Sequence, residues 1–136
     1  ASAGYDAIKL EKKYSGQTKL LAVSVLTSMN KKNLSEIGHT KQLDKLVIHL
    51  SKLAKRAGAY AMICSPHESA KIKKFSKLPS ITPGIRLPGD QSGDQKRIAT
   101  PKFAFDNGAI GIVMGRSLIN GNIKNNFKRL FQHLES

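Results

Sequence analysis

Residues 43–64 read Leu-Asp-Lys-Leu-Val-Ile-His-Leu-Ser-Lys-Leu-Ala-Lys-Arg-Ala-Gly-Ala-Tyr-Ala-Met-Ile-Cys, and this stretch decides the fold. Gly58 stands where a helix commonly ends, and the apolar run 59–64 that follows is typical of a short buried strand. A helix that runs directly into a buried strand predicts the repeating unit of an α/β protein. Before Gly58, apolar residues recur at the spacing of a helix with one buried face, namely Leu43, Leu46, Val47, Leu50, Leu53, Ala54 and Ala57.

The same alternation continues on both sides of this stretch. Residues 19–26 form a continuous apolar run of the kind that is buried on both faces, and 80–82 and 110–114 are two further short strands. The order α-βα-βα-βα-βα predicts a parallel sheet with right-handed crossovers. The remaining predicted helices are an opening one marked by Ala7, Leu10 and Tyr14, a short one over 67–75, one over 100–105 opened by Thr100-Pro101, and a last one with Ile123, Phe127, Leu130, Phe131 and Leu134 on one face.

Four such units form half of a barrel or a small open sheet. The chain has 136 residues, whereas an eightfold (β/α) barrel typically needs roughly 250. We predict one α/β domain over 1–136, the parallel (β/α)4 half of a TIM-type barrel that lacks the first four strands. The first and last strands would be apolar edges, which invite association. We therefore expect self-association, or a partner that supplies the missing strands.

Composition narrows the choice of partner. The net charge is +14, from 23 Lys and Arg against 9 Asp and Glu, and it favours anionic partners such as phosphorylated metabolites or nucleic acids. Basic residues form no run longer than a Lys-Lys pair, and only 6% of residues are aromatic, so nucleic acid is the less favoured of the two.

The sequence also bears on location and metal binding. No apolar run approaches the ~20 residues that span a bilayer, and the first residues show no secretory signal. Cys64 is the single cysteine, which fits a reducing cytoplasm. We therefore expect a cytoplasmic protein without membrane contact. The four histidines lack the spacing of metal ligands, so no metal site is expected.

Hydroxyl, glycine and arginine residues collect just after each predicted strand. Because the carboxyl ends of parallel strands meet at one edge of the sheet, these residues are expected to share one site. Arg86 and Arg116 would supply the bidentate, charge-assisted hydrogen bonds that a phosphate monoester needs. The four segments are 26–29, 64–68, 82–86 and 114–117.

The stretch 84–99 has no periodicity and contains three glycines and a proline. Such a length is unusual for a connection inside a compact domain, and loops of this kind are often functional. We predict that 84–99 is a loop that closes over a bound phosphate and excludes water from it.

Five motifs together resemble the bacterial orotidine 5'-phosphate decarboxylases. Their order and spacing are similar to the C-terminal half of that family across essentially the whole chain. Ala1-Ser2-Ala3-Gly4 resembles the segment just past the fourth barrel strand, so the sequence is expected to begin in mid-barrel. The motifs are Leu-Thr-Ser-Met at 26–29, Ala-Gly…Ile-Cys-Ser-Pro-x-Glu at 57–68, Thr-Pro-Gly-Ile-Arg at 82–86, Gly-Asp-Gln-Lys-Arg-Ile-Ala-Thr-Pro at 93–101 and Met-Gly-Arg-Ser at 114–117.

The resemblance implies roles for residues that would contact the base. Thr27 and Ser28 match the end of the fifth barrel strand, where the serine of the family hydrogen-bonds the pyrimidine amide. Pro83 matches the proline that lies beside the base. These three residues are therefore candidates for pyrimidine binding.

The resemblance also implies roles around the phosphate. Arg86 and Gln95 match groups on the mobile loop that closes over it, and Gly115 and Arg116 match the grip at the end of the eighth strand. The implied ligand is a pyrimidine nucleoside monophosphate. The family's reaction is the conversion of orotidine monophosphate to uridine monophosphate in de novo pyrimidine synthesis, by a lyase that uses no cofactor.

One motif of the family is missing from the sequence. The family's catalytic lysine and aspartates centre on an Asp-x-Lys-x-x-Asp motif, which does not occur in these 136 residues. We assign no catalytic residue, and we expect that this chain alone does not decarboxylate, because preorganised charge is the largest contribution to such catalysis. Two alternatives stay open: a non-catalytic, self-associating half barrel that binds phosphate, and a basic RNA-binding module.

Overall fold

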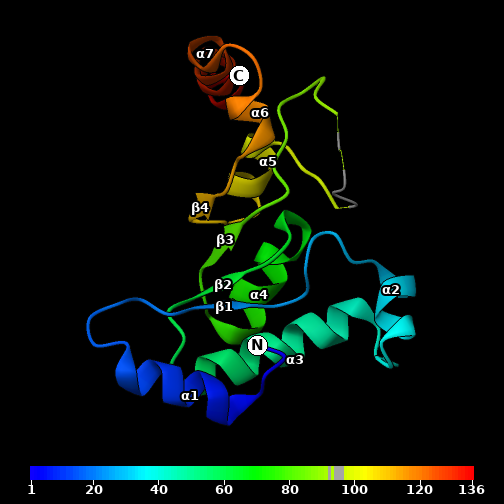
Figure 1. Cartoon of the computed structure of the whole chain (residues 1–136), viewed down its shortest axis with the longest axis vertical. Helices are drawn as coiled ribbons and strands as arrows, with labels where there is room; N and C mark the ends of the chain where they lie inside the picture. Colours follow the sequence, from blue (N-terminus) through cyan, green and yellow to red (C-terminus); the bar gives the residue numbers. More distant parts are fainter. Residues whose placement is uncertain (92, 94–96) are drawn as a thin grey trace.

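A computed structural model describes residues 1–91, 93 and 97–136. Its described strands form one parallel sheet in the order β1-β2-β3-β4, so each strand pairs with its neighbours in sequence (Figure 1). This arrangement confirms the predicted α/β class and the four βα units. The strands are β1 Leu21–Val23, β2 Ala61–Ile63, β3 Ser80–Thr82 and β4 Gly111–Ile112.

The predicted helices are all present, and two short ones were not predicted. Asn30 begins one of these, because its side chain accepts a hydrogen bond from the Asn33 backbone N–H at 3.1 Å. Thr100 caps α5 through the Phe103 N–H at 3.3 Å, as predicted. The predicted helices are α1 Tyr5–Tyr14, α3 Leu43–Arg56, η1 Pro66–Glu68 with α4 Ser69–Ser76, α5 Pro101–Asp106 and α7 Ile123–Glu135, and the two others are α2 Lys31–Glu36 and α6 Arg116–Ile119.

The helix α3 ends where the sequence indicated. Gly58 follows it with φ +92°, a left-handed conformation that glycine adopts without strain. After Gly58 the chain enters β2 within three residues, so residues 43–64 form one helix-strand unit.

None of the described helices is long and apolar enough to cross a bilayer.

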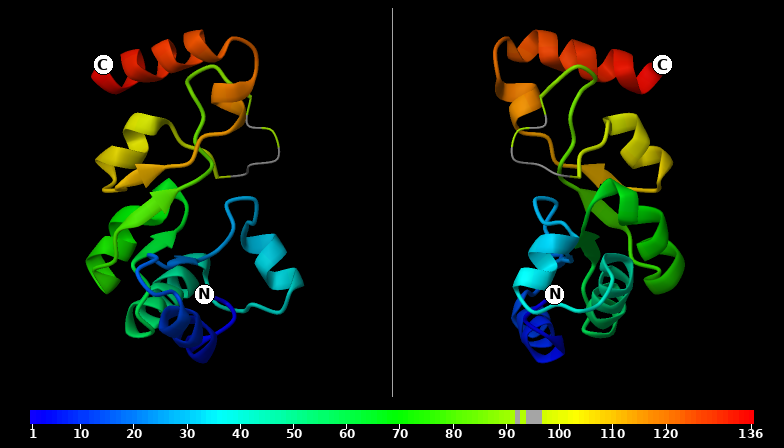
Figure 2. Two further views of the ribbon diagram at one scale, coloured as in Figure 1. Left: turned by 60° about the vertical axis from the view of Figure 1, so that its left-hand side comes forward. Right: turned by 90° about the vertical axis from the view of Figure 1, so that its right-hand side faces the viewer.

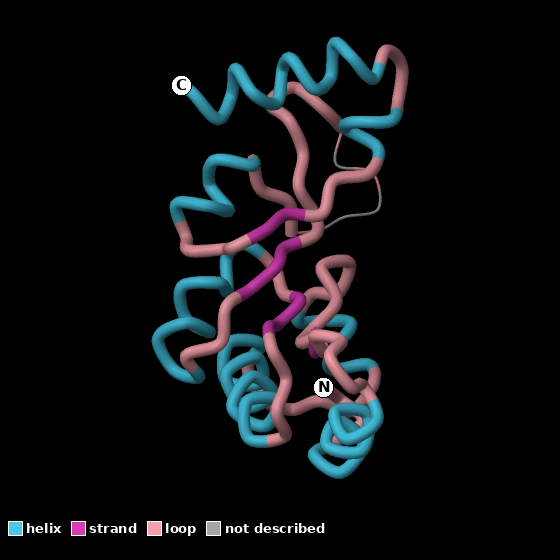
Figure 3. The backbone as a smooth tube through the Cα atoms, turned by 90° about the vertical axis from the view of Figure 1, so that its left-hand side faces the viewer, coloured by secondary structure: helices cyan, strands magenta, loops and turns pink. Residues whose placement is uncertain are grey.

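Only one face of the sheet is covered by helices. In Figure 3, α3, α4 and α5 lie along one side of the strands. Ala22 and Met62 point to that side and are buried, whereas Leu21 and Val23 are each 38% exposed. The expectation that 19–26 is buried on both faces is therefore wrong. The second face of this sheet corresponds to the inside of a barrel, and four strands do not enclose it.

The core lies between the sheet and the helices. Its larger part joins β1 and β2 to α1, α3 and α4, and a small second part joins β4 and α5 through Ile85, Ala104 and Ala109. The larger cluster of buried side chains is Ile8, Ala22, Val25, Leu34, Leu46, Val47, Leu50, Ala54, Ala57, Ala59, Met62, Cys64, Ile72 and Leu78.

The fold brings all four strand ends to one side. Figure 2 shows the strands pointing toward the side that carries α2 and the loop 84–99. The open edges belong to β1 and β4, each of which pairs with one neighbour among the described residues. Ile110 and Val113 beside β4 are more than half exposed. The sheet therefore has two edges with apolar residues, as the sequence predicted.

The buried isoleucine of α4 provides a test of this core. Ile72 is 0% exposed, and Ile119 on α6 is 64% exposed. Ile72→Ala should lower the free energy of unfolding by about 2–5 kcal/mol, because it leaves a cavity in the larger cluster. The matched Ile119→Ala should change it by less than about 0.5 kcal/mol. Urea denaturation followed by circular dichroism measures both, and equal effects would contradict this description of the core.

Candidate nucleotide-binding site

A cavity of about 280 Å³ lies beyond the ends of β3 and β4. Three segments distant in sequence enclose it: the loop after β3, the short helix α6, and α7. The described residues contribute three guanidinium groups and one carboxylate to its wall. Its lining residues are Arg86, Asp90, Gln91, Gly93, Arg116, Ser117, Asn120, Asn126 and Arg129.

Arg86 is fixed in the wall of this cavity by backbone carbonyl groups. The residue is only 7% exposed. Its Nη1 donates to the Ile85 carbonyl at 2.8 Å and its Nε to the Gln91 carbonyl at 3.2 Å. A buried arginine held in this way keeps its orientation, and a preoriented guanidinium loses little conformational entropy on binding an anion.

Arg116 approaches the loop after β3 very closely. An ideal Cβ at Gly93 would lie 2.5 Å from Arg116 Nη1, and the φ of Gly93 is +63°, so glycine suits this position on both counts. The neighbouring Ser117 lines the same cavity with a buried hydroxyl, which also acts on the Asp90 carboxylate and helps to lower its pKa.

The last helix contributes a third guanidinium. Arg129 Nη2 donates to Asp90 Oδ1 at 2.8 Å and to the Pro88 carbonyl at 3.2 Å, which ties the loop to α7. Partial burial would raise the pKa of Asp90, but the hydrogen bond and charge of Arg129, with hydrogen bonds of Ser117 and the Leu87 backbone, outweigh it and lower that pKa. Three arginines against one carboxylate leave an excess of positive charge, which suits an anion.

A second pocket, of about 250 Å³, lies at the ends of β1 and β2. The predicted base-contacting residues Thr27, Ser28 and Pro83 all line it. Pro83 is only three residues from Arg86 of the phosphate cavity, so their Cα atoms are at most about 11 Å apart. The two pockets are therefore neighbours, connected by the segment that leaves β3.

One predicted residue among those that the structure describes lines neither pocket. Gly115 precedes the first residue of α6 and so places Arg116 at the cavity, but it is not part of the lining itself. Gln95 lies outside the described residues. The other predicted residues divide between the pockets: Thr27, Ser28 and Pro83 in one, and Arg86 and Arg116 in the other.

An ion pair between the two pockets was not predicted. Arg97 Nη1 donates to Glu68 Oε1, and the other carboxylate oxygen accepts the Ser65 backbone N–H at 3.2 Å. Glu68 thus caps η1, as its place after a strand suggested, but it also binds the end of the loop. Burial raises the pKa of Glu68, and the charge of Arg97 opposes this rise.

Cys64 next to this pair has no sign of reactivity. Burial raises the pKa of its thiol to about 12, so it stays protonated at neutral pH. Sequence analysis placed it in the core, and the structure confirms this. Among the described residues, no three His, Cys, Asp or Glu side chains gather in a way that would hold a metal ion.

Among the described lining residues, Arg86 and Arg116 were predicted individually, while Asp90, Gln91 and Gly93 belong to the predicted loop 84–99 and Ser117 ends the predicted segment 114–117. Sequence reasoning missed Asn120, Asn126 and Arg129. Asn126 and Arg129 are three apart on α7, on a face that the apolar pattern of the helix leaves polar. Nothing in the sequence indicates that this face meets the loop after β3.

Fold and cavities together define the class: a partial (β/α) barrel with an arginine-lined cavity beyond the ends of its strands. A family model described as "Orotidine 5'-phosphate decarboxylase / HUMPS family" matches residues 1–125. The chain belongs to the orotidine 5'-phosphate decarboxylase / HUMPS family.

Curated relatives agree with this assignment. The orotidine 5'-phosphate decarboxylase of Pseudoalteromonas translucida is 45% identical over 101 residues, which are 73% of this chain and 43% of the relative. That of Buchnera aphidicola subsp. Schizaphis graminum is 42% identical over 119 residues, 86% of this chain and 50% of the relative. The chain thus spans about half the length of the curated relatives it matches.

Solved structures support the fold. The crystal structure of orotidine 5'-phosphate decarboxylase from Lactobacillus acidophilus matches 98% of this chain and 60% of its own, with a TM-score of 0.75 and 30% identity. That of the Methanocaldococcus jannaschii enzyme, complexed with the inhibitor BMP, has a TM-score of 0.69 and 19% identity, and it supports the fold alone. The predicted partial barrel is confirmed.

The ion pair of Arg129 and Asp90 is expected to control the titration of Asp90. In Arg129→Gln the pKa of Asp90 should rise, because burial is then opposed by the hydrogen bonds of Ser117 and the Leu87 backbone without the charge of Arg129. Since the folded-state pKa is lowered in the wild type, the stabilisation from this carboxylate is present above the unfolded-state pKa and is lost as the pH falls through the folded-state value.

An NMR titration of the Asp90 carboxyl carbon measures this shift. Lys71→Gln is the matched control, because it removes the cation 2.5 Å from Asp44 and leaves the cavity intact. The pKa of Asp90 should not move in that control. An Asp90 pKa that stays the same in Arg129→Gln would show that Arg129 does not stabilise the carboxylate.

Proposed function

We propose that this chain binds a pyrimidine nucleoside monophosphate across the two neighbouring pockets. The phosphate would occupy the cavity beyond β3 and β4, and the base would occupy the pocket at the ends of β1 and β2. The observation that carries the proposal is the convergence of Arg86, Arg116 and Arg129 with the Ser117 hydroxyl in one cavity. This donor set matches the charge and oxygens of a phosphate dianion.

We infer the position of the loop 84–99 relative to the phosphate from its described residues. Arg86, Asp90, Gln91 and Gly93 all belong to 84–99 and line the cavity. We assign the described part of the loop to one wall of the phosphate site. Gln95, the predicted phosphate contact on this loop, lies outside the described residues.

The proposal for the base rests on the second pocket. Thr27 and Ser28 offer hydroxyl groups, which can pair with the imide and carbonyl groups of a pyrimidine. Pro83 offers an apolar surface beside them, and it leads directly to Arg86. One nucleotide placed along this segment would meet hydroxyls at its base and guanidinium groups at its phosphate.

The reaction proposed for the whole protein is the decarboxylation of orotidine monophosphate to uridine monophosphate, as the names of the relatives suggest. The two pockets would bind and orient the nucleotide. The Asp-x-Lys-x-x-Asp motif is missing from the printed sequence, so the proton donor and the charges that act on the carboxylate must come from residues outside it. We place the protein in the cytoplasm, which its single cysteine favours.

Further strands are proposed to pair with the open edges of the sheet. Leu21 and Val23 on the uncovered face, and Ile110 and Val113 beside β4, expose apolar surface to water. Four more strands would bury this surface and satisfy the unpaired backbone groups. A second copy of this half barrel, or the complementary half of a decarboxylase, would supply them.

Calorimetric titration with uridine monophosphate tests the binding proposal. Arg116→Ala should weaken binding by about 1.5–3 kcal/mol, or roughly 10- to 100-fold, because a charge-assisted grip on the phosphate is lost. Arg56→Ala is the matched control: Arg56 is an exposed arginine at the end of α3, over the Tyr5 ring, and does not line the cavity. The affinity of Arg56→Ala for uridine monophosphate should equal that of the wild type.

The same titration separates nucleotide binding from the alternative of an RNA-binding module. Tight binding to homopolymeric RNA with a steep dependence on salt, together with no binding of the nucleotide, would favour that alternative. Equal loss of nucleotide affinity in Arg116→Ala and Arg56→Ala would show that binding follows net charge and not the cavity.

Light scattering at micromolar concentration tests whether a second chain pairs with the open edges of the sheet. The expected mass is at least twice that of one chain, because a lone half barrel exposes two apolar edges. A single-chain mass would contradict this. Adding a chain that carries Asp-x-Lys-x-x-Asp then distinguishes the partners, since only a complementary half should bring decarboxylation of orotidine monophosphate.

A further inference from the structure

The loop 84–99 is bound at its returning end by a buried network centred on Arg97. The Arg97 side chain is 13% exposed and that of Glu68 only 4%. Besides the ion pair, Arg97 Nη2 donates to the carbonyl groups of Val25 at 3.1 Å and Leu26 at 2.9 Å. One guanidinium thus joins the loop, the helix turn after β2, and the end of β1.

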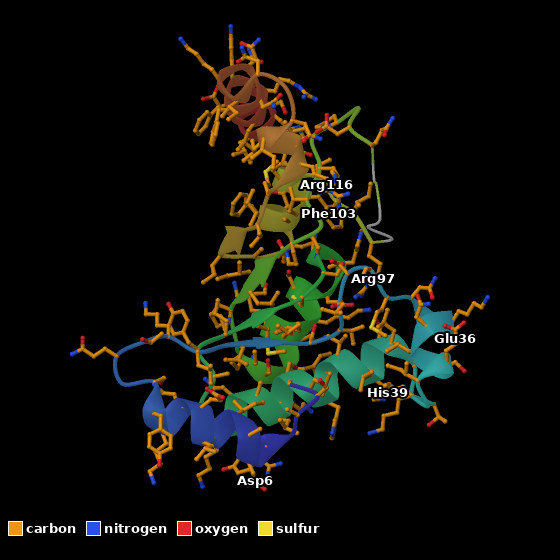
Figure 4. All side chains as sticks on the ribbon, viewed as in Figure 1. Asp6, Glu36, His39, Arg97, Phe103 and Arg116 are labelled. Atoms are coloured by element: carbon orange, nitrogen blue, oxygen red, sulfur yellow. The ribbon has the colours of Figure 1, made fainter. Side chains whose placement is uncertain are left out.

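The contact with Leu26 bears directly on the base pocket. The Leu26 carbonyl also accepts the Met29 backbone N–H at 2.9 Å, which closes a turn with Thr27 and Ser28 at its centre. Arg97 therefore holds the first residue of the turn that carries both candidate base-binding hydroxyls. Figure 4 places Arg97 and Arg116 on the same side of the molecule.

Neighbouring contacts keep Arg97 itself in place. His67 Nε2 lies 3.0 Å from the Ile98 carbonyl, and its ring packs against Phe103 with centroids 4.9 Å apart. The Ala99 N–H donates to the Gly84 carbonyl at 3.2 Å, so the two ends of the loop pair with each other. Movement of the loop base is thus coupled to the end of β1 through Arg97.

We propose that Arg97 is a positioning residue: it fixes the Thr27-Ser28 turn relative to the phosphate cavity and so sets the distance between base and phosphate recognition. The inference rests on the proposed function for the identity of the ligand. Arg97 does not line either pocket, and it acts through the Val25 and Leu26 carbonyls. Its effect is therefore expected on nucleotide selectivity and not on phosphate affinity.

The test uses Arg97→Lys, because an ammonium keeps the charge opposite Glu68 but lacks the planar fork that reaches two carbonyls as well. Affinity for uridine monophosphate should fall about tenfold, while affinity for ribose 5-phosphate, which has no base, should stay within about twofold of wild type. Lys71→Met, which removes an exposed ion pair on α4, is the control and should change neither affinity. An equal fall for both ligands would overturn the inference.

Hydrogen exchange provides a measurement that needs no ligand. In Arg97→Lys the Met29 amide should exchange about tenfold faster than in wild type, while the amides of α3 keep their rates, because only the turn is released. Unchanged exchange at Met29 would overturn the inference. This measurement decides the role of Arg97 even where wild type binds neither ligand, an outcome that would refute the proposed function.

Glu68→Gln separates the two parts of the network. The amide oxygen can still accept from Arg97, but the charge and the second acceptor, which binds the Ser65 N–H, are lost, while the carbonyl contacts of Arg97 persist. Met29 exchange should then stay within about threefold of wild type. A tenfold rise in this variant would assign the effect to the buried ion pair alone and would overturn the role of the carbonyl contacts.

Discussion

The parallel pairing of four consecutive strands is the constraint on which the rest of the structure depends. Because each strand pairs with the next in sequence and in the same direction, every βα connection begins at the same edge of the sheet. Segments around 27, 65, 84 and 115 therefore meet without any direct attraction between them. The anion cavity forms at that edge because the last two connections carry arginine.

The helices could be predicted more closely than the strands, for a physical reason. The stripe on α3 repeats over 14 residues and fixes both its face and its end. The run 19–26 fixes a strand but not its limits, and β1 covers only Leu21–Val23. Backbone hydrogen bonds continue just beyond this strand: the Tyr60 N–H donates to the Leu20 carbonyl, and the Ser24 N–H donates to the Ile63 carbonyl. The helices α2 and α6 are too short to show periodicity.

The residues of the candidate site fall into two groups: those that the local sequence pattern predicts, and those that only the tertiary fold brings together. Residues directly after a strand were found, because the parallel sheet alone determines where they lie. Arg129 meets Asp90 across 39 positions in sequence, and Arg97 meets Val25 across 72. Such pairs depend on how the last helix and the loop pack, and no pattern within either segment encodes that packing. The network between the two pockets is thus a property of the folded chain.

The two pockets differ in how far this chain completes them. The phosphate cavity is lined only by residues between Arg86 and Arg129, and the small core of Ile85, Ala104 and Ala109 supports it from within the same segment. The base pocket instead includes Val23 and Ile63, whose side chains point to the uncovered face of the sheet. Whatever covers that face forms the remaining wall of the base pocket. Under the proposed function, this half of the barrel would therefore contain the phosphate site, whereas selectivity for the base would be shared with the surface that closes the pocket.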